Sequence, residues 1–335
     1  MRKTAIFPAW GRILRGFRPF LSIEITKQCP LRCPGCYAFE PAHLNNGRPI
    51  LDLAEWQGDE LVERVLELAG RLRPLHVSIG GGEPLVRYRE LTRLIPQLNA
   101  MGIEVQVVTS AVWPIPAEWA ELPNLHLVVS VDGLQPEHDA RRAPATYDRI
   151  LRHIGSHRIV VHCTVTSQFL AQPDYLKEFA HQWSSLAGVT KIWFSLFTPQ
   201  AGEYPPERLS AADRLTAIDR IAALRSLYPK VYAPTILLHG YRHPPDSPAE
   251  CIFAQTTICV SADLETAVIP CQIGGRPECA ECGCVAGAGL AALGKFKLAG
   301  LVSVADVFAM SKRLGDRLRG NDLLQSPCSG NTKQV

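Results

Sequence analysis

The sequence predicts an α/β protein: an open, partial (β/α)6 barrel with a small cysteine-rich domain at its C-terminal end. Between residues 21 and 240, short apolar runs alternate with amphipathic stretches of helical spacing, and they form six strand–helix units. Such alternation implies a parallel sheet with helices outside it, and six units are fewer than the eight of a closed barrel. Six cysteines gather between residues 251 and 284, which indicates a second, smaller unit.

The expected elements follow one another in a regular order along the core. The segment LSIEIT at 21–26 alternates apolar and polar residues, as a half-buried strand does. Further strands are expected at 75–79, 103–108, 125–131, 158–166 and 189–196. Helices are expected at 51–73, 88–101, 147–154, 174–187 and 211–227.

A Pro-rich, polar stretch at 241–249 is typical of a boundary between two units. Beyond it, residues 256–271 are expected to form a two-stranded hairpin, and helices are expected at 286–298 and 304–318. We therefore divide the chain into an N-terminal extension (1–20), a core (21–240), a cysteine-rich domain (241–320) and a flexible tail (321–335).

Composition excludes several classes of protein. Of the 335 residues, 47% are hydrophobic and 20% are charged, so the chain can build a packed core and is not disordered. The formal net charge of +3 is too small to indicate a nucleic-acid or membrane partner. The eleven clustered cysteines do not resemble a secreted disulfide framework, and no apolar stretch is long enough for a signal peptide or a membrane span. We expect a cytoplasmic protein with reduced thiols.

The first cysteine group, CPLRCPGC, places Cys29, Cys33 and Cys36 directly after the first expected strand. Three thiolates in eight residues can converge on one metal centre. A closed structural zinc site needs four ligands, and no further Cys or His lies at zinc-finger spacing; His43 is the alternative fourth ligand. A cubane held by three cysteines instead leaves one iron open, and thiolates favour iron–sulfur chemistry.

At this loop the sequence resembles a known family. The segment EITKQCPLRCPGCY resembles the signature loop of the radical S-adenosylmethionine (radical SAM) superfamily, and the resemblance covers roughly residues 20–240. It implies a partial six-unit barrel, a [4Fe-4S] cluster on Cys29, Cys33 and Cys36, and bound S-adenosyl-L-methionine. The family usually has an aromatic residue before the third cysteine, near the adenine. Here that residue is Gly35, and we expect Tyr37 or Phe39 to replace it.

A Gly-rich string, GGGEP, follows the second expected strand. Taken alone, it is equally well explained as a turn that closes the strand. Glycines also let a backbone approach a ligand closely, and a carboxylate accepts hydrogen bonds from an ammonium group. The resemblance implies that Gly81, Gly82 and Glu83 bind the methionyl amino group of the cofactor.

The string SVDGLQPEHDARR after the fourth expected strand resembles a stretch of radical SAM enzymes that carry an auxiliary cluster. The resemblance implies that Ser130 and Asp132 face the ribose or methionyl region. It also implies that the planar guanidinium of Arg142 pairs with the methionyl carboxylate; the alternative for Arg142 is a surface salt bridge. Thr109, at the end of the third expected strand, is a weaker candidate for the ribose hydroxyls.

The C-terminal cysteines fit two kinds of site. Four thiolates would make a structural zinc ribbon, which is the favoured reading of this segment in isolation. After a radical SAM barrel, however, such a segment resembles the twitch or SPASM extension, which implies one auxiliary [4Fe-4S] cluster. The expected ligands are Cys251, Cys271, Cys279 and Cys282, with Cys284 and Cys259 as alternates. Cys163, in an apolar strand, and Cys328, near the tail, are expected to bind no metal.

The resemblance implies an enzyme that reductively cleaves S-adenosyl-L-methionine to a 5′-deoxyadenosyl radical, which abstracts a substrate hydrogen. An auxiliary cluster points to an oxidative or bond-forming modification of a small molecule or peptide. Only about twenty residues precede the first strand, so no appended leader-peptide domain is expected. An electron donor such as flavodoxin or ferredoxin is required. The alternatives are a non-enzymatic iron–sulfur or zinc-binding module and an RNA-modifying radical enzyme, although the low net charge gives no support to nucleic-acid binding.

Overall fold

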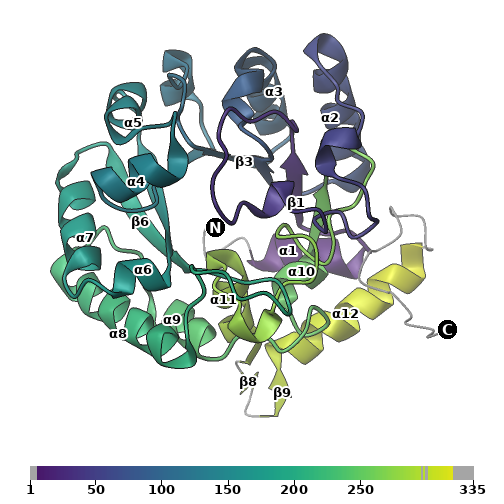
Figure 1. Cartoon of the computed structure of the whole chain (residues 1–335). Helices are drawn as coiled ribbons and strands as arrows, with labels where there is room; N and C mark the ends of the chain where they lie inside the picture. The colour runs from purple at the N-terminus through teal and green to yellow at the C-terminus, as the bar shows by residue number, and fades with distance from the viewer. Residues whose placement is uncertain (1–5, 296, 299–300, 320–335) are drawn as a thin grey trace.

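The central element of the protein is a seven-stranded sheet in which every pair of neighbouring strands is parallel. The structure is a computed structural model that describes residues 6–295, 297–298 and 301–319. The strand order is β6-β5-β4-β3-β2-β1-β7, and the sheet curves into an open partial barrel with helices along its outer side (Figure 1). The fold class predicted from the sequence is therefore confirmed.

The strands of this sheet are β1 (Phe20–Glu24), β2 (His76–Gly80), β3 (Glu104–Thr109), β4 (Leu125–Ser130), β5 (Ile159–Val165), β6 (Val189–Leu196) and β7 (Thr257–Val260). A separate antiparallel pair consists of β8 (Lys297–Leu298) and β9 (Val302–Ser303). The helices of the first half are α1 (Ile6–Leu14), α2 (Gly58–Leu72), α3 (Tyr88–Ala100), α4 (Gln135–Arg142), α5 (Tyr147–His153) and α6 (Ser167–Leu170). Those of the second half are α7 (Tyr175–Ser185), α8 (Ala211–Leu227), α9 (Thr235–Arg242), α10 (Ile252–Thr256), α11 (Val285–Lys295) and α12 (Val304–Arg319).

The two faces of the sheet differ in chemistry. Alternate side chains such as Leu21, Ile23, Val77 and Ile79 are fully buried in the main hydrophobic core. The side chains between them form the inner face of the barrel and are largely polar: Ser22, Ser78, Gln106, Ser130, His162, Thr164, Trp193 and Ser195. Because side chains alternate along a strand, one apolar face packs on the helices and the other leaves a polar lumen.

All six expected core strands are present, and the turn expected within 256–271 is present as well. Its first half is β7, and the chain then folds back through the antiparallel bridge between Val260 and Ala267 and the hydrogen bond from the Val268 N–H to the Cys259 carbonyl at 2.9 Å. The second half is not a regular strand, and β7 also pairs in parallel with β1, which was not predicted. This pairing covers backbone groups that β1 would otherwise leave unpaired at the edge of the sheet. The C-terminal cysteine segment thereby contributes a strand to the main sheet.

Three further expectations need correction. The helix expected at 51–73 begins at Gly58, because Gln57 has an extended backbone and residues 50–52 form a separate 3-10 turn. The helix expected at 286–298 ends at Lys295 and is followed by β8. Helix α1 was not predicted; it packs against α12, where Gly315 lies so close to Ile13 that a Cβ would come within 2.1 Å of its carbonyl oxygen. The tail at 321–335, with Cys328, lies outside the described residues.

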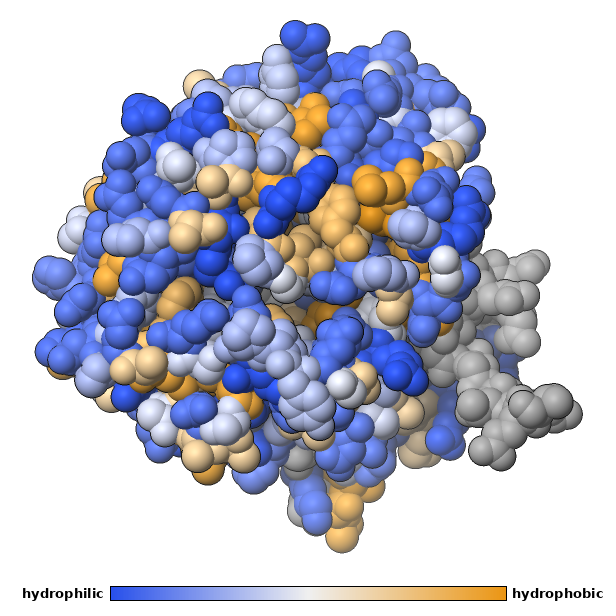
Figure 2. All heavy atoms as spheres, in the orientation of Figure 1, coloured by the Kyte–Doolittle hydropathy of each residue, from blue (hydrophilic) through white to orange (hydrophobic). Residues whose placement is uncertain are grey.

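No helix in the described part of the chain is long and apolar enough to cross a membrane. On the face shown in Figure 2, polar side chains cover most of the surface, and apolar side chains gather near its centre. None of the ten cysteines within the described ranges is in a disulfide bond.

Candidate functional site

The predicted site residues meet at one edge of the sheet. The first cysteine group follows β1, the GGGEP string begins at the last residue of β2, Thr109 ends β3, and Ser130 and Asp132 stand at the end of β4. In a parallel sheet the carboxyl ends of neighbouring strands meet at the same edge, which is where ligands bind in open α/β folds. The order of the strands therefore places these segments next to one another.

The cysteine loop is held over a small apolar cluster. Leu31, within the loop, is 1% exposed and packs with Val112 and Ala145. Cys29, Cys33 and Cys36 are half-buried. Burial, together with the charges of Glu83 and of the two other thiols, raises the pKa of Cys29 to about 11. The same burial raises the pKa values of Cys33 and Cys36, and a bound metal ion would oppose these shifts because it favours the thiolate.

Within the described ranges, no three His, Cys, Asp or Glu side chains are already placed to hold one metal ion. The donor set itself is three neighbouring thiols on one loop. His43 does not complete it, because its two ring nitrogens contact Glu24 and the backbone carbonyl of Ile273. The three thiols therefore fit a centre with three protein ligands better than a closed four-ligand zinc site.

The residue before the third cysteine, Gly35, has a left-handed backbone with φ +66°. A Cβ at this position would lie 3.2 Å from the ring of Phe197, which belongs to the loop after β6. The aromatic ring beside Gly35 is therefore Phe197, which the sequence did not indicate. Tyr37 instead packs its ring against His43, and Phe39 packs against a separate apolar cluster.

The glycines of the GGGEP string lie against the chain itself. A Cβ at Gly81 would come within 2.7 Å of the carbonyl oxygen of Thr26, and one at Gly82 within 2.1 Å of that of Gln28. The Gly82 N–H also donates to the Thr26 carbonyl at 2.8 Å, and the Glu83 N–H to the Gln28 carbonyl at 2.8 Å. A close approach to a ligand was predicted for these glycines; in the structure they lie against the backbone at the start of the cysteine loop.

Glu83 is 2% exposed and accepts hydrogen bonds on both carboxylate oxygens. Its Oε1 accepts from the Leu85 N–H at 3.0 Å and from the Thr109 hydroxyl. Its Oε2 accepts from the Ser110 N–H at 2.8 Å and from the Ser110 hydroxyl at 2.5 Å. Four donors therefore surround the carboxylate and join the ends of β2 and β3. Ser110 was missed in the sequence, where only its position beside Thr109 could have indicated it.

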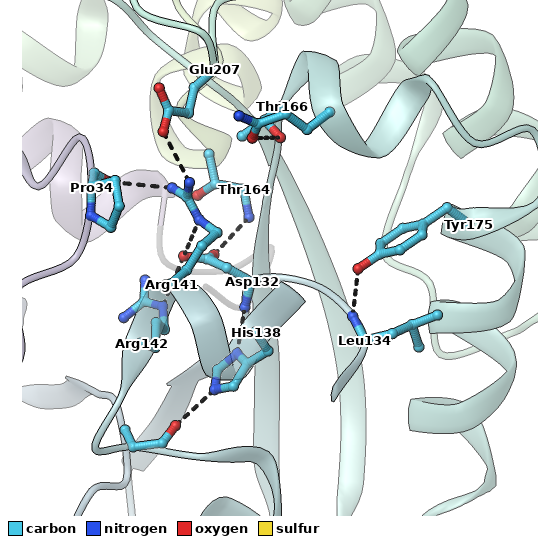
Figure 3. A network of polar contacts seen from close by, with 12 residues as sticks. Pro34, Asp132, Leu134, His138, Arg141, Arg142, Thr164, Thr166, Tyr175 and Glu207 are labelled. Atoms are coloured by element: carbon cyan, nitrogen blue, oxygen red, sulfur yellow. Dashed lines mark hydrogen bonds and ion pairs between the residues drawn. The ribbon is translucent and has the colours of Figure 1, made fainter. Parts of the chain in front are cut away.

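Asp132 is at the centre of a buried ionic network (Figure 3). It pairs with Arg142 Nε at 2.8 Å and with Arg141 Nε at 3.8 Å. Arg141 also donates hydrogen bonds to Glu207 Oε1 at 3.0 Å and to the Pro34 carbonyl at 3.2 Å. The network thus connects the end of β4 with the cysteine loop and with the segment after β6. Arg141 and Glu207 were not predicted from the sequence.

The charges of this network support one another. Burial opposes ionisation of Asp132, but Arg142 and then Arg141 hold the pKa of its carboxyl below the usual range. Burial likewise opposes the charge of Arg142, but Asp132 and the nearby thiols Cys33 and Cys36 raise the pKa of its guanidinium. Of the three side-chain nitrogens of Arg142, only Nε is hydrogen-bonded within the described residues. Its two terminal nitrogens remain available as a fork for a carboxylate.

His138 fixes the turn that carries Asp132. Its Nδ1 accepts from the Asp132 N–H at 3.0 Å, and its Nε2 donates to the Ala145 carbonyl at 2.8 Å. Because one nitrogen accepts and the other donates, this histidine is neutral, and burial lowers its pKa. Ser130, by contrast, lies on β4 in register with His162 of β5, on the inner face of the barrel.

We expect Asp132→Asn to lower the free energy of unfolding by about 3 kcal/mol at pH 7, because the partly buried guanidinium of Arg142 loses its counter-ion and Arg141 keeps only Glu207. The pKa of Asp132 is depressed, so its contribution is complete above its unfolded value of about 4 and is lost as pH falls through the folded value. Denaturant unfolding of both proteins at several pH values measures the difference. It should shrink below about pH 4, and Asp148→Asn, at an exposed position, should change little.

The C-terminal cysteine segment packs along the loop after β6. The Leu196 N–H donates to the Gly283 carbonyl at 3.0 Å, and the Ala201 N–H donates to the Arg276 carbonyl at 2.7 Å. A Cβ at Gly283 would lie 2.0 Å from the Leu196 carbonyl oxygen, so this approach requires glycine. Arg214 then donates to the carbonyls of Glu281 and Cys282 at 2.7 and 3.1 Å.

Several thiols of this segment interact with one another. Burial raises the pKa of Cys282 to about 12, and the charges of Cys284, Cys251 and Cys279 add to the shift. Burial also raises the pKa of Cys251 to about 11, again with contributions from Cys284 and Cys279. The pKa of Cys271 is raised by burial and then by Cys259, Cys284 and Cys282. Cys284, predicted only as an alternate ligand, thus acts on all three.

Part of the chain is similar to known proteins. Residues 23–167 match the model of the radical SAM superfamily. The match covers the part of the chain that holds the first cysteine group and the ends of β1 to β4. The chain is 34% identical to a 7-carboxy-7-deazaguanine synthase of Hyperthermus butylicus over 102 residues. The aligned residues are 30% of this chain and 39% of that protein. The chain is 36% identical to a PqqA peptide cyclase of Rhodopseudomonas palustris over 90 residues. The aligned residues are 27% of this chain and 22% of that protein.

A solved structure is similar over a longer range. The crystal structure of Streptococcus suis SuiB bound to precursor peptide SuiA aligns with a TM-score of 0.57 and 16% identity. The alignment covers 94% of this chain and 72% of SuiB. At this identity the likeness concerns the fold, and it extends beyond the barrel to the C-terminal segment.

Proposed function

We propose that this protein is a radical SAM enzyme that uses a three-cysteine [4Fe-4S] cluster and S-adenosyl-L-methionine to oxidise or join atoms of a substrate. One observation supports this most directly. The thiols of Cys29, Cys33 and Cys36 and the Asp132–Arg142 pair lie at the same edge of the sheet. When bound, these cofactors supply a one-electron cleavage that gives methionine and a 5′-deoxyadenosyl radical, which takes a hydrogen atom from the substrate. A reduced flavodoxin or ferredoxin is the proposed electron source.

The residues of the site have distinct proposed tasks. Arg142 binds the methionyl carboxylate through its terminal nitrogens while Asp132 holds its Nε. Glu83 receives the methionyl ammonium in place of one of its two hydroxyl donors, Thr109 or Ser110. Ser130 remains a candidate for the ribose side, as predicted, because it lies on the lumen face next to these groups.

For the C-terminal segment we propose one auxiliary [4Fe-4S] cluster. Its ligands would be Cys251, Cys271 and Cys282, with either Cys279 or Cys284 as the fourth. The mutual influence of these buried thiols supports the grouping, and it favours Cys284 over Cys279. Cys259 is a weaker candidate, because it is packed in an apolar cluster with Leu44, Ile50, Leu53 and Val268.

We propose a peptide as the substrate. The resemblance to PqqA peptide cyclases, in the part of the barrel that matches, supports this class. The lumen also suits a peptide: His162, whose pKa is lowered by burial to about 4, is neutral and lies 2.8 Å from the Ser195 hydroxyl. The match to a 7-carboxy-7-deazaguanine synthase makes a small molecule the second candidate.

Deuterium transfer distinguishes the two substrate classes even while the exact substrate is unidentified. We expect reconstituted, reduced enzyme to form deuterium-labelled 5′-deoxyadenosine with a fully deuterated peptide fraction, because the radical takes its hydrogen from the substrate. A deuterated small-metabolite fraction, prepared from the cells that supply the peptide fraction, is the comparison. Mass spectrometry of 5′-deoxyadenosine is the measurement. Label only from the small-metabolite fraction would contradict the peptide proposal.

A further inference from the structure

A buried polar chain connects the two cysteine-rich segments. His43, 1% exposed, lies seven residues after Cys36, and its Nε2 is 2.6 Å from Oε1 of Glu24 at the end of β1. Its Nδ1 is 3.1 Å from the carbonyl oxygen of Ile273. A carbonyl oxygen only accepts, so Nδ1 carries a proton and donates it. The other oxygen of Glu24 accepts from the Ser261 hydroxyl at 2.6 Å, directly after β7.

The backbone reinforces this connection. The Gly275 N–H donates to the His43 carbonyl at 2.9 Å. Gly274 has φ +69°, and a Cβ there would lie 2.3 Å from both Nδ1 and the carbonyl oxygen of His43. Only glycine permits this approach. The strand end, the loop after the first cysteine group and residues 273–275 are thus packed around a single imidazole.

The same segment is held at its other side by the loop after β6. Gln200 Oε1 accepts from the Arg276 N–H at 2.7 Å, and the Thr198 hydroxyl accepts from the Gly283 N–H at 2.9 Å. The C-terminal cysteine segment therefore spans from β6 to the end of β1, which are near opposite ends of the open sheet. Figure 1 shows this green segment lying between the two sides of the arc of helices.

We propose that His43 is a positioning residue that holds residues 271–278 against the loop of the first cysteine group. Its hydrogen bond to Ile273 sets where Cys271 and Cys279 lie relative to Cys29, Cys33 and Cys36. The inference rests on the proposed function, in which an auxiliary cluster on the C-terminal cysteines accompanies the cluster on the first cysteine group. Glu24 is the anchor that orients the imidazole, as carboxylates orient histidines behind metal sites.

Two substitutions test the two contacts of the imidazole separately. In His43→Asn the amide nitrogen replaces Nδ1, so the contact with Ile273 is kept and the contact with Glu24 is lost. In His43→Gln the amide nitrogen replaces Nε2, so the contact with Glu24 is kept and the contact with Ile273 is lost. We expect amide hydrogen exchange of residues 271–278 in the full-length, metal-free protein to accelerate at least about tenfold in His43→Gln, and to stay close to wild type in His43→Asn.

After reconstitution, His43→Gln should lose iron from the C-terminal group and keep the iron of the first group, while His43→Asn keeps both. His157→Gln is the matched control, because His157 is buried between the carbonyls of Ile154 and Pro116, away from the cysteine groups. It should leave exchange at 271–278 unchanged. Equal exchange in the two His43 variants would overturn the proposal. Absence of C-terminal iron in the wild type would refute the auxiliary cluster instead, and the exchange result would still decide the role of His43.

Discussion

Replacement of Cys29, Cys33 and Cys36 together by alanine is expected to abolish formation of 5′-deoxyadenosine. Without the three thiolates no cluster is held at the strand edge, so no electron reaches the sulfonium of S-adenosyl-L-methionine. The wild-type protein, reconstituted anaerobically and reduced, should form 5′-deoxyadenosine and methionine in equal amounts. Chromatography of the quenched reactions measures both products, and the variant should give none above the background of the reductant.

The fold should survive this change, because the three thiols are half-buried and the apolar side chains that hold the loop are those of Leu31, Val112 and Ala145. Cys163→Ala provides a matched control. Cys163 is 1% exposed in the main core, so its replacement should lower stability by about 1 kcal/mol and leave product formation intact. Product formation by the triple variant at the wild-type rate would show that the loop is not the site of cofactor cleavage.

The sequence was most informative where local pattern decides the outcome. Strands β1 to β6 were predicted because a short apolar run, alternating with polar residues in the first of them, marks each strand, and parallel pairing then brings the motifs at their ends to one edge. Strand β7 was predicted as the first half of a hairpin, but its parallel pairing with β1 was missed because that pairing depends on the free edge of β1. No local signal within Thr257–Val260 distinguishes an added parallel strand from the first half of a hairpin.

The candidate site was predictable in its residue types but not in its pairings. Asp132 and Arg142 were both identified, but the sequence did not show that they pair, nor that Arg141 extends the pair to Glu207. For Gly82, a close approach to a ligand was predicted, whereas the observed neighbour is the carbonyl of Gln28. Such contacts join segments that are distant in sequence, so only the packed structure reveals them.

The alternatives left open by the sequence are also affected. A zinc site completed by His43 is disfavoured, because both ring nitrogens of His43 already have partners. The match of residues 23–167 to the model of the radical SAM superfamily argues against a purely structural metal module in this part of the chain. For the C-terminal cysteines, however, zinc and iron–sulfur remain distinct chemical outcomes, since both metals accept four thiolates.

Replacement of Cys251, Cys271 and Cys282 together by alanine is expected to halve the iron content of the reconstituted protein, from about eight to about four. The four remaining irons belong to the first cysteine group. Deletion of the whole segment is a poorer experiment, because it would remove β7 from the main sheet and expose the edge of β1. Elemental analysis of anaerobically purified protein, with electron paramagnetic resonance of the reduced state, gives the measurement.

Two single variants then identify the fourth ligand. Because the charge of Cys284 acts on Cys251, Cys271 and Cys282, we expect Cys284→Ala to lose the second cluster signal and Cys279→Ala to retain it. The reverse result would return Cys279 to the ligand set as predicted from the sequence. If the wild type instead holds about four irons and roughly one zinc, the segment is a structural zinc site. The substrate radical would then need an electron acceptor other than this segment, and the proposed oxidative reaction would lose its main structural support.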